Sequence, residues 1–239
     1  MNLALPPRLT RWAPILVALG AVLVCFFQLG EQGLRMWDET RHGEAAWQML
    51  QRGEYIDYYY DGQRDDWLAK PPFGIWLIAL SYKLIGFSEL GLRAPSALAG
   101  VGIILLTYFL VRLYRGVGVA FWSAVILMLC RGIVGQHVAR TGDLDAVYIL
   151  TAMAMIYLLQ LAEVKNQRVW LPIAAVFGGL CFLSKGFMMG LFLPGLGLYM
   201  LLSGRAGALI KDWLFWLAAL VFGGFIGGWY LVVKKLGTP

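Results

Sequence analysis

Long apolar runs, separated by short polar turns, dominate the sequence. A membrane-spanning helix needs about 20 mostly apolar residues, and several segments reach or approach that length. They are residues 12–29, 94–114, 117–136, 144–162, 169–184, 186–202 and 212–233. The pattern predicts an all-α, polytopic transmembrane helix bundle with about seven spans.

Residues 30–93 form a long polar stretch in which we expect two further helices. One begins at Asp38, a favourable N-cap residue, and ends at Gly53, a favourable C-cap. The other covers residues 71–86 and opens with two prolines, which suit a first helical turn. It is apolar, but it is only about 16 residues long and contains Lys83, so we interpret both helices as juxtamembrane rather than spanning.

Basic residues at the turns between spans support this interpretation. If residues 71–86 lie on the membrane surface, the basic turns all fall on the side of the N-terminus, as cytoplasmic loops require. These turns carry Arg8/Arg11, Arg112/Arg115, Lys165/Arg168 and Arg205/Lys211. We therefore expect a multi-pass protein of the cytoplasmic (inner) membrane, with the loop 30–93 on the outer, periplasmic side.

Composition agrees with this class of protein and excludes others. Apolar residues make up 60% of the chain and charged residues 14%, whereas a soluble domain carries about 25% charged residues. The net charge of +6 could suggest a nucleic-acid partner. The basic residues, however, are scattered singly at the ends of apolar runs, where they set topology. We expect the lipid bilayer as a partner and no nucleic acid.

The predicted topology brings polar residues from separate parts of the chain to the outer side, near helix ends. This convergence is typical of a functional site. The residues are Asp38, Glu39, Arg41, Lys70, Arg140, Asp143, Asp145 and Lys185.

Several of these residues also have a structural interpretation. Asp38 and Asp143 would cap helices, and Glu39 would favour a helix dipole. Lys70 is either a solvated interfacial lysine or a cation just before a helix N-terminus, where it and the free backbone N–H groups could together hold a phosphate. Lys185 interrupts a long apolar run, and an ionisable residue at membrane depth costs at least a few kcal/mol, so it indicates function. Its structural alternative is a turn lysine that reaches towards water.

A metal site is less well supported. His42 and His137 are the two histidines, and both fall on the predicted outer side near carboxylates. Their spacing matches no tight ligand pattern, so we assign no metal ligand. A cofactor is unknown from the sequence, with a divalent metal as the alternative left open.

Five segments resemble one family of enzymes. Residues 36–44 (MWDETRHGE) resemble the DE motif in the first outer loop of GT-C membrane glycosyltransferases, in the branch of lipid A aminoarabinose transferases and protein mannosyltransferase-like enzymes. Residues 70–76 resemble the KPP segment of that branch, and residues 92–98 the start of its second span. Residues 140–146 resemble its R-T-x-D-x-D element, and residues 184–186 its KG turn. The shared order along the chain makes the resemblance specific.

The resemblance implies an inverting transfer of sugar from a polyprenyl-phosphate donor to a lipid, glycan or protein acceptor on the outer face. Asp38 would be the catalytic carboxylate. The cations would neutralise the departing phosphate, which stabilises developing charge. The predicted site residues are Asp38 and Glu39 as catalytic, and Arg41, Lys70, Asp143, Asp145 and Lys185 as substrate-binding.

Two departures from the family pattern matter. Ala69 stands where aminoarabinose transferases carry an acidic residue, which weakens both a metal site there and that exact activity. Family members also have more spans and a soluble outer domain at the C-terminus. We therefore expect residues 1–239 to be an N-terminal transmembrane catalytic module without those parts. Their absence leaves a rival open, a non-catalytic lipid-carrier binding or translocation subunit of the same fold.

Overall fold

The computed structural model describes residues 5–34, 38–64, 71–135, 138–204 and 206–235. Nearly all of the regular structure in these ranges is helical, with one two-stranded hairpin. The chain divides into two compact units, which are described separately. Unit 1 comprises Met1–Asp65 and Ile75–Leu150, and unit 2 comprises Asp66–Gly74 and Thr151–Pro239.

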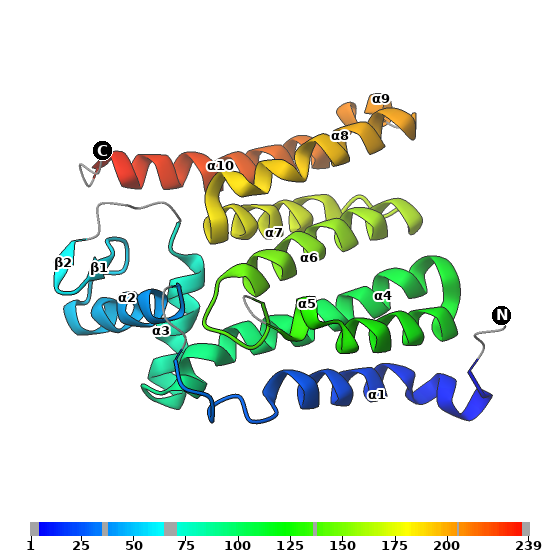
Figure 1. Ribbon diagram of the computed structural model, residues 1–239. Helices are drawn as coiled ribbons and strands as arrows, with labels where there is room; N and C mark the ends of the chain where they lie inside the picture. Colours follow the sequence, from blue (N-terminus) through cyan, green and yellow to red (C-terminus); the bar gives the residue numbers. More distant parts are fainter. Residues whose placement is uncertain (1–4, 35–37, 65–70, 136–137, 205, 236–239) are drawn as a thin grey trace. The chain divides into compact units, whose positions relative to one another are not determined.

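Unit 1 is built on α1 (Pro7–Phe26) and α4 (Glu89–Leu129), which lie side by side in Figure 1. The 41-residue α4 is interrupted at Gly116, whose φ of 81° and ψ of 177° are not helical. Glycine adopts such a backbone without steric cost. Ala13, Val17 and Ala21 of α1 share one hydrophobic cluster with residues from both halves of α4. The two halves of α4 therefore both pack against α1, which positions the start of α4 near the end of α1.

Two shorter helices follow α1, as the sequence predicts. They are α2 (Asp38–Arg52) and α3 (Phe73–Ile85). Each ends at a left-handed glycine, Gly53 with φ of 72° and Gly86 with φ of 101°. Their N–H groups donate to the carbonyls of Met49 and Tyr82, both at 3.0 Å. Such bonds satisfy carbonyls at a helix C-terminus, so the predicted ends of both helices are confirmed.

A hairpin that the sequence reasoning did not anticipate lies between these helices. Strands β1 (Tyr59–Tyr60) and β2 (Gln63–Arg64) pair antiparallel. Asp61 and Gly62 connect them with φ of 50° and 72°. Positive φ at both central residues is the requirement of the tightest hairpin turns, and Asp-Gly meets it.

Unit 2 contains most of α6 (Asp145–Val164), followed by α7 (Trp170–Lys185), η1 (Gly186–Leu191), α8 (Leu193–Leu202), α9 (Ala206–Ile210) and α10 (Trp213–Lys235). Glycines let α7 approach its neighbours. A Cβ at Gly179 would lie 2.2 Å from the Phe225 ring of α10, and one at Gly178 would lie 3.1 Å from Met155 of α6. Small residues at helix contacts are typical of membrane bundles.

Five helices among the described residues are long and apolar enough to cross a membrane: α1, α4, α6, Trp170–Leu191 and α10. Of these, α4 covers the predicted spans 94–114 and most of 117–136 on either side of Gly116. The predicted span 186–202 instead begins as the 3-10 helix η1 and continues as the 10-residue α8. The all-α membrane bundle is confirmed, and the count of seven spans stays a prediction.

Within each unit, turns that carry the basic residues lie at a common end. In unit 1, Leu5, Val111 and Val117 each pack against the same hydrophobic cluster, and the start of α1 lies at the same end as the turn at the middle of α4 (Figure 1). In unit 2, Arg168 Nε lies 3.7 Å from Asp212 Oδ2, which joins the turn before α7 to the turn before α10. Both arrangements agree with the charge pattern, while the side of the membrane stays a prediction.

Candidate functional site

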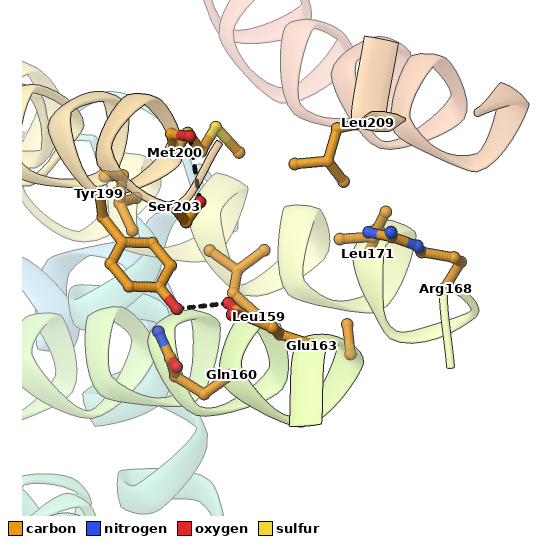
Figure 2. Close-up of a pocket in the computed structure, with 11 residues that line it drawn as sticks. Leu159, Gln160, Glu163, Arg168, Leu171, Tyr199, Met200, Ser203 and Leu209 are labelled. Carbon is orange, nitrogen blue, oxygen red and sulfur yellow. Dashed lines mark hydrogen bonds between the residues drawn. The ribbon is translucent and has the colours of Figure 1, made fainter. Parts of the chain in front are cut away.

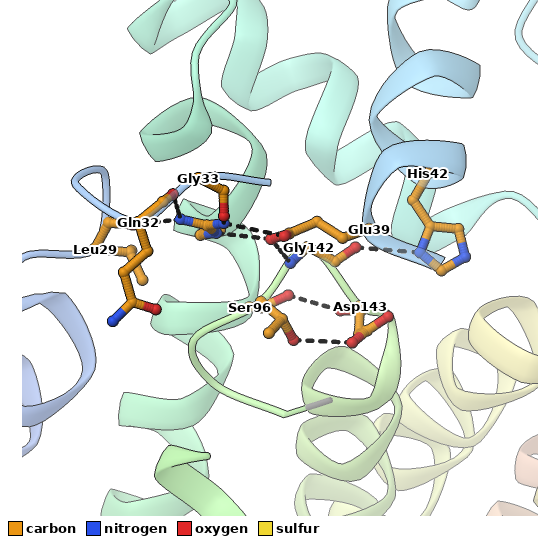
Figure 3. Close-up of polar contacts among 10 residues, drawn as sticks. Leu29, Gln32, Gly33, Glu39, His42, Ser96, Gly142 and Asp143 are labelled. Carbon is orange, nitrogen blue, oxygen red and sulfur yellow. Dashed lines mark hydrogen bonds and ion pairs between the residues drawn. The ribbon is translucent and has the colours of Figure 1, made fainter. Parts of the chain in front are cut away.

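A buried ion pair connects α2 to α4 in unit 1. Glu39, the second residue of α2, is 2% exposed, and Arg93, in the first turns of α4, is 1% exposed. Arg93 Nε donates to Glu39 Oε1 at 2.7 Å, and Arg93 Nη2 donates to Oε2 at 3.0 Å. This is the bidentate geometry that makes arginine–carboxylate pairs strong (Figure 3).

The remaining donors of Arg93 hold the segment that leaves α1. Nη1 donates to the carbonyls of Leu29 at 3.0 Å and Gln32 at 2.6 Å, and Nη2 donates to the carbonyl of Gly33 at 3.0 Å. With the two bonds to Glu39, the donors of the guanidinium are all used. We call this group, Arg93 with Glu39 and the three carbonyls, the Arg93 clamp. It fixes where the chain enters α2, and therefore where Asp38 stands.

Gly142 attaches a second loop to α2. Its N–H donates to Glu39 Oε1 at 2.8 Å, and its carbonyl lies 3.1 Å from His42 Nδ1. Because a carbonyl only accepts, His42 Nδ1 carries the proton. A Cβ at Gly142 would lie 2.7 Å from Leu92 Cγ and 3.1 Å from Glu39 Cγ. A residue without a side chain is therefore needed for the loop to reach α2.

This contact brings the predicted acidic residues of the loop to the start of α2. Asp143 is 4% exposed, and its Oδ2 accepts from the Thr141 hydroxyl at 2.9 Å. Its carbonyl accepts from the Ser96 hydroxyl at 2.7 Å. The Tyr148 N–H donates to the Leu144 carbonyl at 3.1 Å, so Asp143 lies one residue before the N-cap of α6. The carboxylate of Asp143 therefore braces the loop.

Three further predicted residues stand at helix starts in unit 1. Asp38 opens α2 and Asp145 opens α6, and both are half-buried. Arg41, also half-buried, places its guanidinium carbon 5.8 Å from the centre of the Tyr60 ring. Unit 1 thus gathers Asp38, Glu39 and Arg41 on the first turns of α2, to which the loop with Asp143 and Asp145 is bonded. Their catalytic and binding roles stay predictions.

Lys185 ends α7 in unit 2 and is half-buried. Gly186 follows with φ of 60° and donates its N–H to the Phe182 carbonyl, which terminates the helix. A Cβ at Gly186 would lie 3.4 Å from Pro71 Cδ. The chain just after Lys70 therefore passes beside the turn at Lys185. Lys70 itself lies outside the described residues.

The divalent metal left open above gains no support. Among the residues that the structure describes, no cluster of three or more His, Cys, Asp or Glu side chains could hold a metal ion. His42 Nδ1 is engaged by Gly142, and His137 lies outside the described residues. A metal requirement stays an open expectation.

A small pocket in unit 2 does not have the size of a substrate site. It has a volume of about 50 Å³ and is lined mainly by apolar side chains of α6, α7 and α8 (Figure 2). The Tyr199 hydroxyl donates to Glu163 Oε2 across it at 2.5 Å. A buried water needs roughly 10–15 Å³ measured in this way, so the pocket has room for a few waters at most and is too small for a sugar.

The sequence did not predict that two arginines of this region hold the backbone in place. Arg93 was assigned only to the start of a span, and Arg140 only to the predicted outer side. Arg140 donates from Nη2 to the Phe27 carbonyl at 2.7 Å and from Nη1 to the Val24 carbonyl at 3.3 Å, which satisfies the C-terminus of α1. Their charge could have indicated these roles, because an arginine at the start of an apolar helix requires a partner.

Comparison with known proteins gives a consistent family. Residues 69–229 match the model of the dolichyl-phosphate-mannose-protein mannosyltransferase family. A protein of Pseudomonas fluorescens Pf-5, named undecaprenyl phosphate-alpha-4-amino-4-deoxy-L-arabinose arabinosyl transferase 2, is 30% identical over 94% of this chain and 39% of its own length. A protein of Aquifex aeolicus is 29% identical over 93% of this chain and 44% of its own length.

The fold also matches a solved structure. ArnT from Cupriavidus metallidurans, crystallised with undecaprenyl phosphate, has a TM-score of 0.75 at 23% identity, covering 95% of this chain and 42% of that chain. Its apo form gives a TM-score of 0.74. The expected resemblance to GT-C membrane glycosyltransferases is thereby confirmed. The chain spans less than half the length of these relatives.

Proposed function

This chain belongs to the dolichyl-phosphate-mannose-protein mannosyltransferase family, and from that premise we propose that it forms the membrane part of a glycosyltransferase. Its donor is a polyprenyl-phosphate sugar. A relative is named for transfer from an undecaprenyl-phosphate sugar, and the structurally similar ArnT was crystallised with undecaprenyl phosphate. Both observations support a lipid phosphate as the carrier.

The observation that carries the proposal is the Arg93 clamp together with Gly142. A carboxylate that acts in group transfer must be held in a fixed place, by neighbours whose own positions are locked. Glu39 is locked by Arg93 and in turn binds the loop at Gly142. The buried bonds from Glu39 to Arg93 and to Gly142 therefore also hold Asp38, the residue directly before Glu39, in place.

The reaction follows from these residues. An acceptor hydroxyl transfers its proton to Asp38 as its oxygen attacks the anomeric carbon of the sugar. The bond from that carbon to the carrier phosphate oxygen breaks, and the electron pair leaves with the phosphate. Attack from the face opposite the phosphate inverts the anomeric centre. The cations that the family resemblance assigns to the carrier phosphate, Arg41, Lys70 and Lys185, would stabilise the charge that develops on it.

We propose a positioning role for Glu39 in place of the catalytic one. Both of its carboxylate oxygens accept from Arg93, and one also accepts from Gly142. At 2% exposure, Glu39 has little access to a substrate. Asp145, half-buried at the start of α6, is better placed to contact the sugar. We place the acceptor on the outer face of the cytoplasmic membrane, as the charge pattern predicts.

The test uses purified protein with several polyprenyl-phosphate sugars, and it follows release of the carrier phosphate. Asp38→Asn should lower the rate about 100-fold or more, because general base help is typically worth 10²–10⁴-fold. Asp38 lies in the first turn of α2, where Asn keeps the shape of the side chain and loses only a helix-dipole interaction of about 0.3–1 kcal/mol, so thermal stability should change little. Glu31→Gln is the control, since it neutralises an exposed carboxylate of the same loop.

Two outcomes would contradict the proposal in different ways. Near-normal turnover of Asp38→Asn would remove Asp38 from the chemical step and direct attention to Asp145. Absence of carrier release from every donor, with tight binding of undecaprenyl phosphate, would instead favour the non-catalytic carrier-binding subunit.

A further inference from the structure

A second, larger pocket opens in unit 1 between α2, α3 and the start of α4. Its volume is about 290 Å³, and Gly43, Tyr82 and Leu92 are among the residues that line it. Pockets for small ligands start at about 300 Å³, so it has room for one small organic group. Asp38, Glu39 and Arg93 do not line this pocket, although Thr40 and Leu92, which lie close to them in sequence, do.

Three aromatic side chains form one side of this pocket. The ring of Phe87 lies 4.5 Å from that of Trp47 and 5.0 Å from that of Tyr82, measured between centroids. Trp47 and Phe87 are 36% and 62% exposed, while Tyr82 is 6% exposed. The aromatic surface therefore runs from the mouth of the pocket to its base.

The hydroxyl of Tyr82 is placed to bind something in the pocket. A Cβ at Gly43 would lie 3.0 Å from this oxygen and 3.3 Å from Leu92, so the glycine keeps space open around it. Within the described part of the chain, the Tyr82 hydroxyl makes no hydrogen bond. Burial first, and then the nearby Glu39 and Glu89, raise its pKa to about 12, so the phenol stays neutral. A phenol hydroxyl can both donate and accept, so this group is available to hydrogen-bond a molecule that enters the pocket.

The charged residues that line the pocket are both acidic. Glu44 comes from α2 and Glu89 from the first turn of α4, and no lysine or arginine is among the described lining residues. Glu44 Oε1 accepts from the Asp61 N–H at 2.7 Å, which fixes the orientation of its carboxylate. Negative potential in a partly enclosed space repels phosphate. The carrier phosphate of the proposed reaction is therefore excluded from this pocket.

We propose that this pocket binds an organic ammonium group. Aromatic faces attract cations, and cages of such rings are a recurring way to bind ammonium ligands. Trp47 and Phe87 supply the faces, and Glu44 and Glu89 supply opposite charge. The oxygen of Tyr82 accepts one N–H bond at the base. The ammonium belongs either to the headgroup of an ethanolamine lipid, which would reach the pocket from the bilayer, or to a soluble amine. Both have the same chemistry at the site.

Matched probes that differ only in charge test this proposal. The protein, in an uncharged detergent, is titrated calorimetrically with 2-phenylethylammonium chloride and with 2-phenylethanol. The ammonium should bind at least about tenfold more tightly, since the cation adds its attraction to the rings and carboxylates. Glu89→Gln should weaken ammonium binding by about tenfold and leave the alcohol unchanged, because it removes charge and keeps shape.

Trp47→Leu provides a second variant with the carboxylates intact, and it should weaken the ammonium more than the alcohol. Glu54→Gln is the control, because Glu54 is an exposed carboxylate of the same region that does not line the pocket. Circular dichroism confirms that each variant folds. Equal affinity of the two probes, or unchanged ammonium affinity in both Glu89→Gln and Trp47→Leu, would overturn the proposal.

Bilayer discs identify the source of the ammonium. Discs of phosphatidylethanolamine should compete with the probe and raise its apparent dissociation constant, relative to discs of phosphatidylglycerol, if the lipid headgroup is the natural ligand. Equal constants in the two discs would assign the pocket to a soluble amine. Whether the natural ligand is the lipid headgroup or a soluble amine, Glu89→Gln must still weaken binding of the 2-phenylethylammonium probe.

Discussion

Removal of the Arg93 side chain should be among the most destabilising single changes in unit 1. Arg93→Ala leaves the Glu39 carboxylate, 2% exposed, without its counter-charge. Loss of one partner of a buried pair costs about 3–5 kcal/mol, because the remaining charge is buried and uncompensated. The carbonyls of Leu29, Gln32 and Gly33 also lose their donor. We expect a loss near the upper end of that range.

The free energy of unfolding can be measured in mixed micelles, with sodium dodecyl sulfate as the denaturant and tryptophan fluorescence as the signal. Arg112→Ala is the matched control, since Arg112 is exposed on the same helix and should change stability by about 0.5 kcal/mol or less. The double variant Arg93→Met/Glu39→Leu removes both charges at similar volume. The double variant should be destabilised by about 1–3 kcal/mol less than the sum of the two matching single variants, Arg93→Met and Glu39→Leu.

Additive effects of the two single changes would refute the reasoning, because they would show that Arg93 and Glu39 do not stabilise each other. Equal stability of Arg93→Ala and Arg112→Ala would refute it more directly. In that case the Arg93 clamp would not hold the segment between α1 and α2.

Three further predictions concern the loop contact, the carrier and the topology. Gly142→Ala should lower the unfolding free energy by about 1–3 kcal/mol, since its Cβ would press on Leu92 at 2.7 Å, whereas Gly223→Ala in open space should change it little. Lys185→Ala should weaken undecaprenyl phosphate binding by about 1.5–3 kcal/mol in a lipid-binding assay, with an unchanged melting temperature, and unchanged affinity would remove Lys185 from the phosphate site. A single cysteine at Arg64 should react with an impermeant reagent from outside the cell and one at Arg115 from inside, and the reverse pattern would invert the topology.

Features set by nearby residues were predictable from the sequence. The apolar runs predicted the long helices, because a membrane span depends only on the composition of its own residues. Gly53 and Gly86 predicted the ends of α2 and α3, because a left-handed C-cap favours glycine. The Asp61-Gly62 turn was equally local, yet its strands have only two residues each. Such short strands carry no alternating pattern, so the hairpin was missed.

Features set by distant residues were not predictable in the same way. Nothing near Glu39 indicates that its partner is Arg93, which follows 54 residues later. The need for glycine at position 142 likewise arises from the approach of Leu92, and not from the local backbone. The candidate site was therefore found as a set of residues, while the bonds that hold it required the structure. Lys70 lies outside the described residues, so its role in binding phosphate stays a prediction.

The separation of Glu39 and Arg93 along the chain has a consequence for biosynthesis. Ribosomes add about 5–20 residues per second, so α2 is complete several seconds before its arginine partner is made. During that interval Glu39 and the carbonyls after α1 remain hydrated, and the segment between α1 and α2 has no stable arrangement. Docking of this segment must await insertion of α4. A ribosome pause or a truncation before Arg93 would therefore yield an inserted first helix with an unfolded extension, which is a substrate for membrane quality-control proteases.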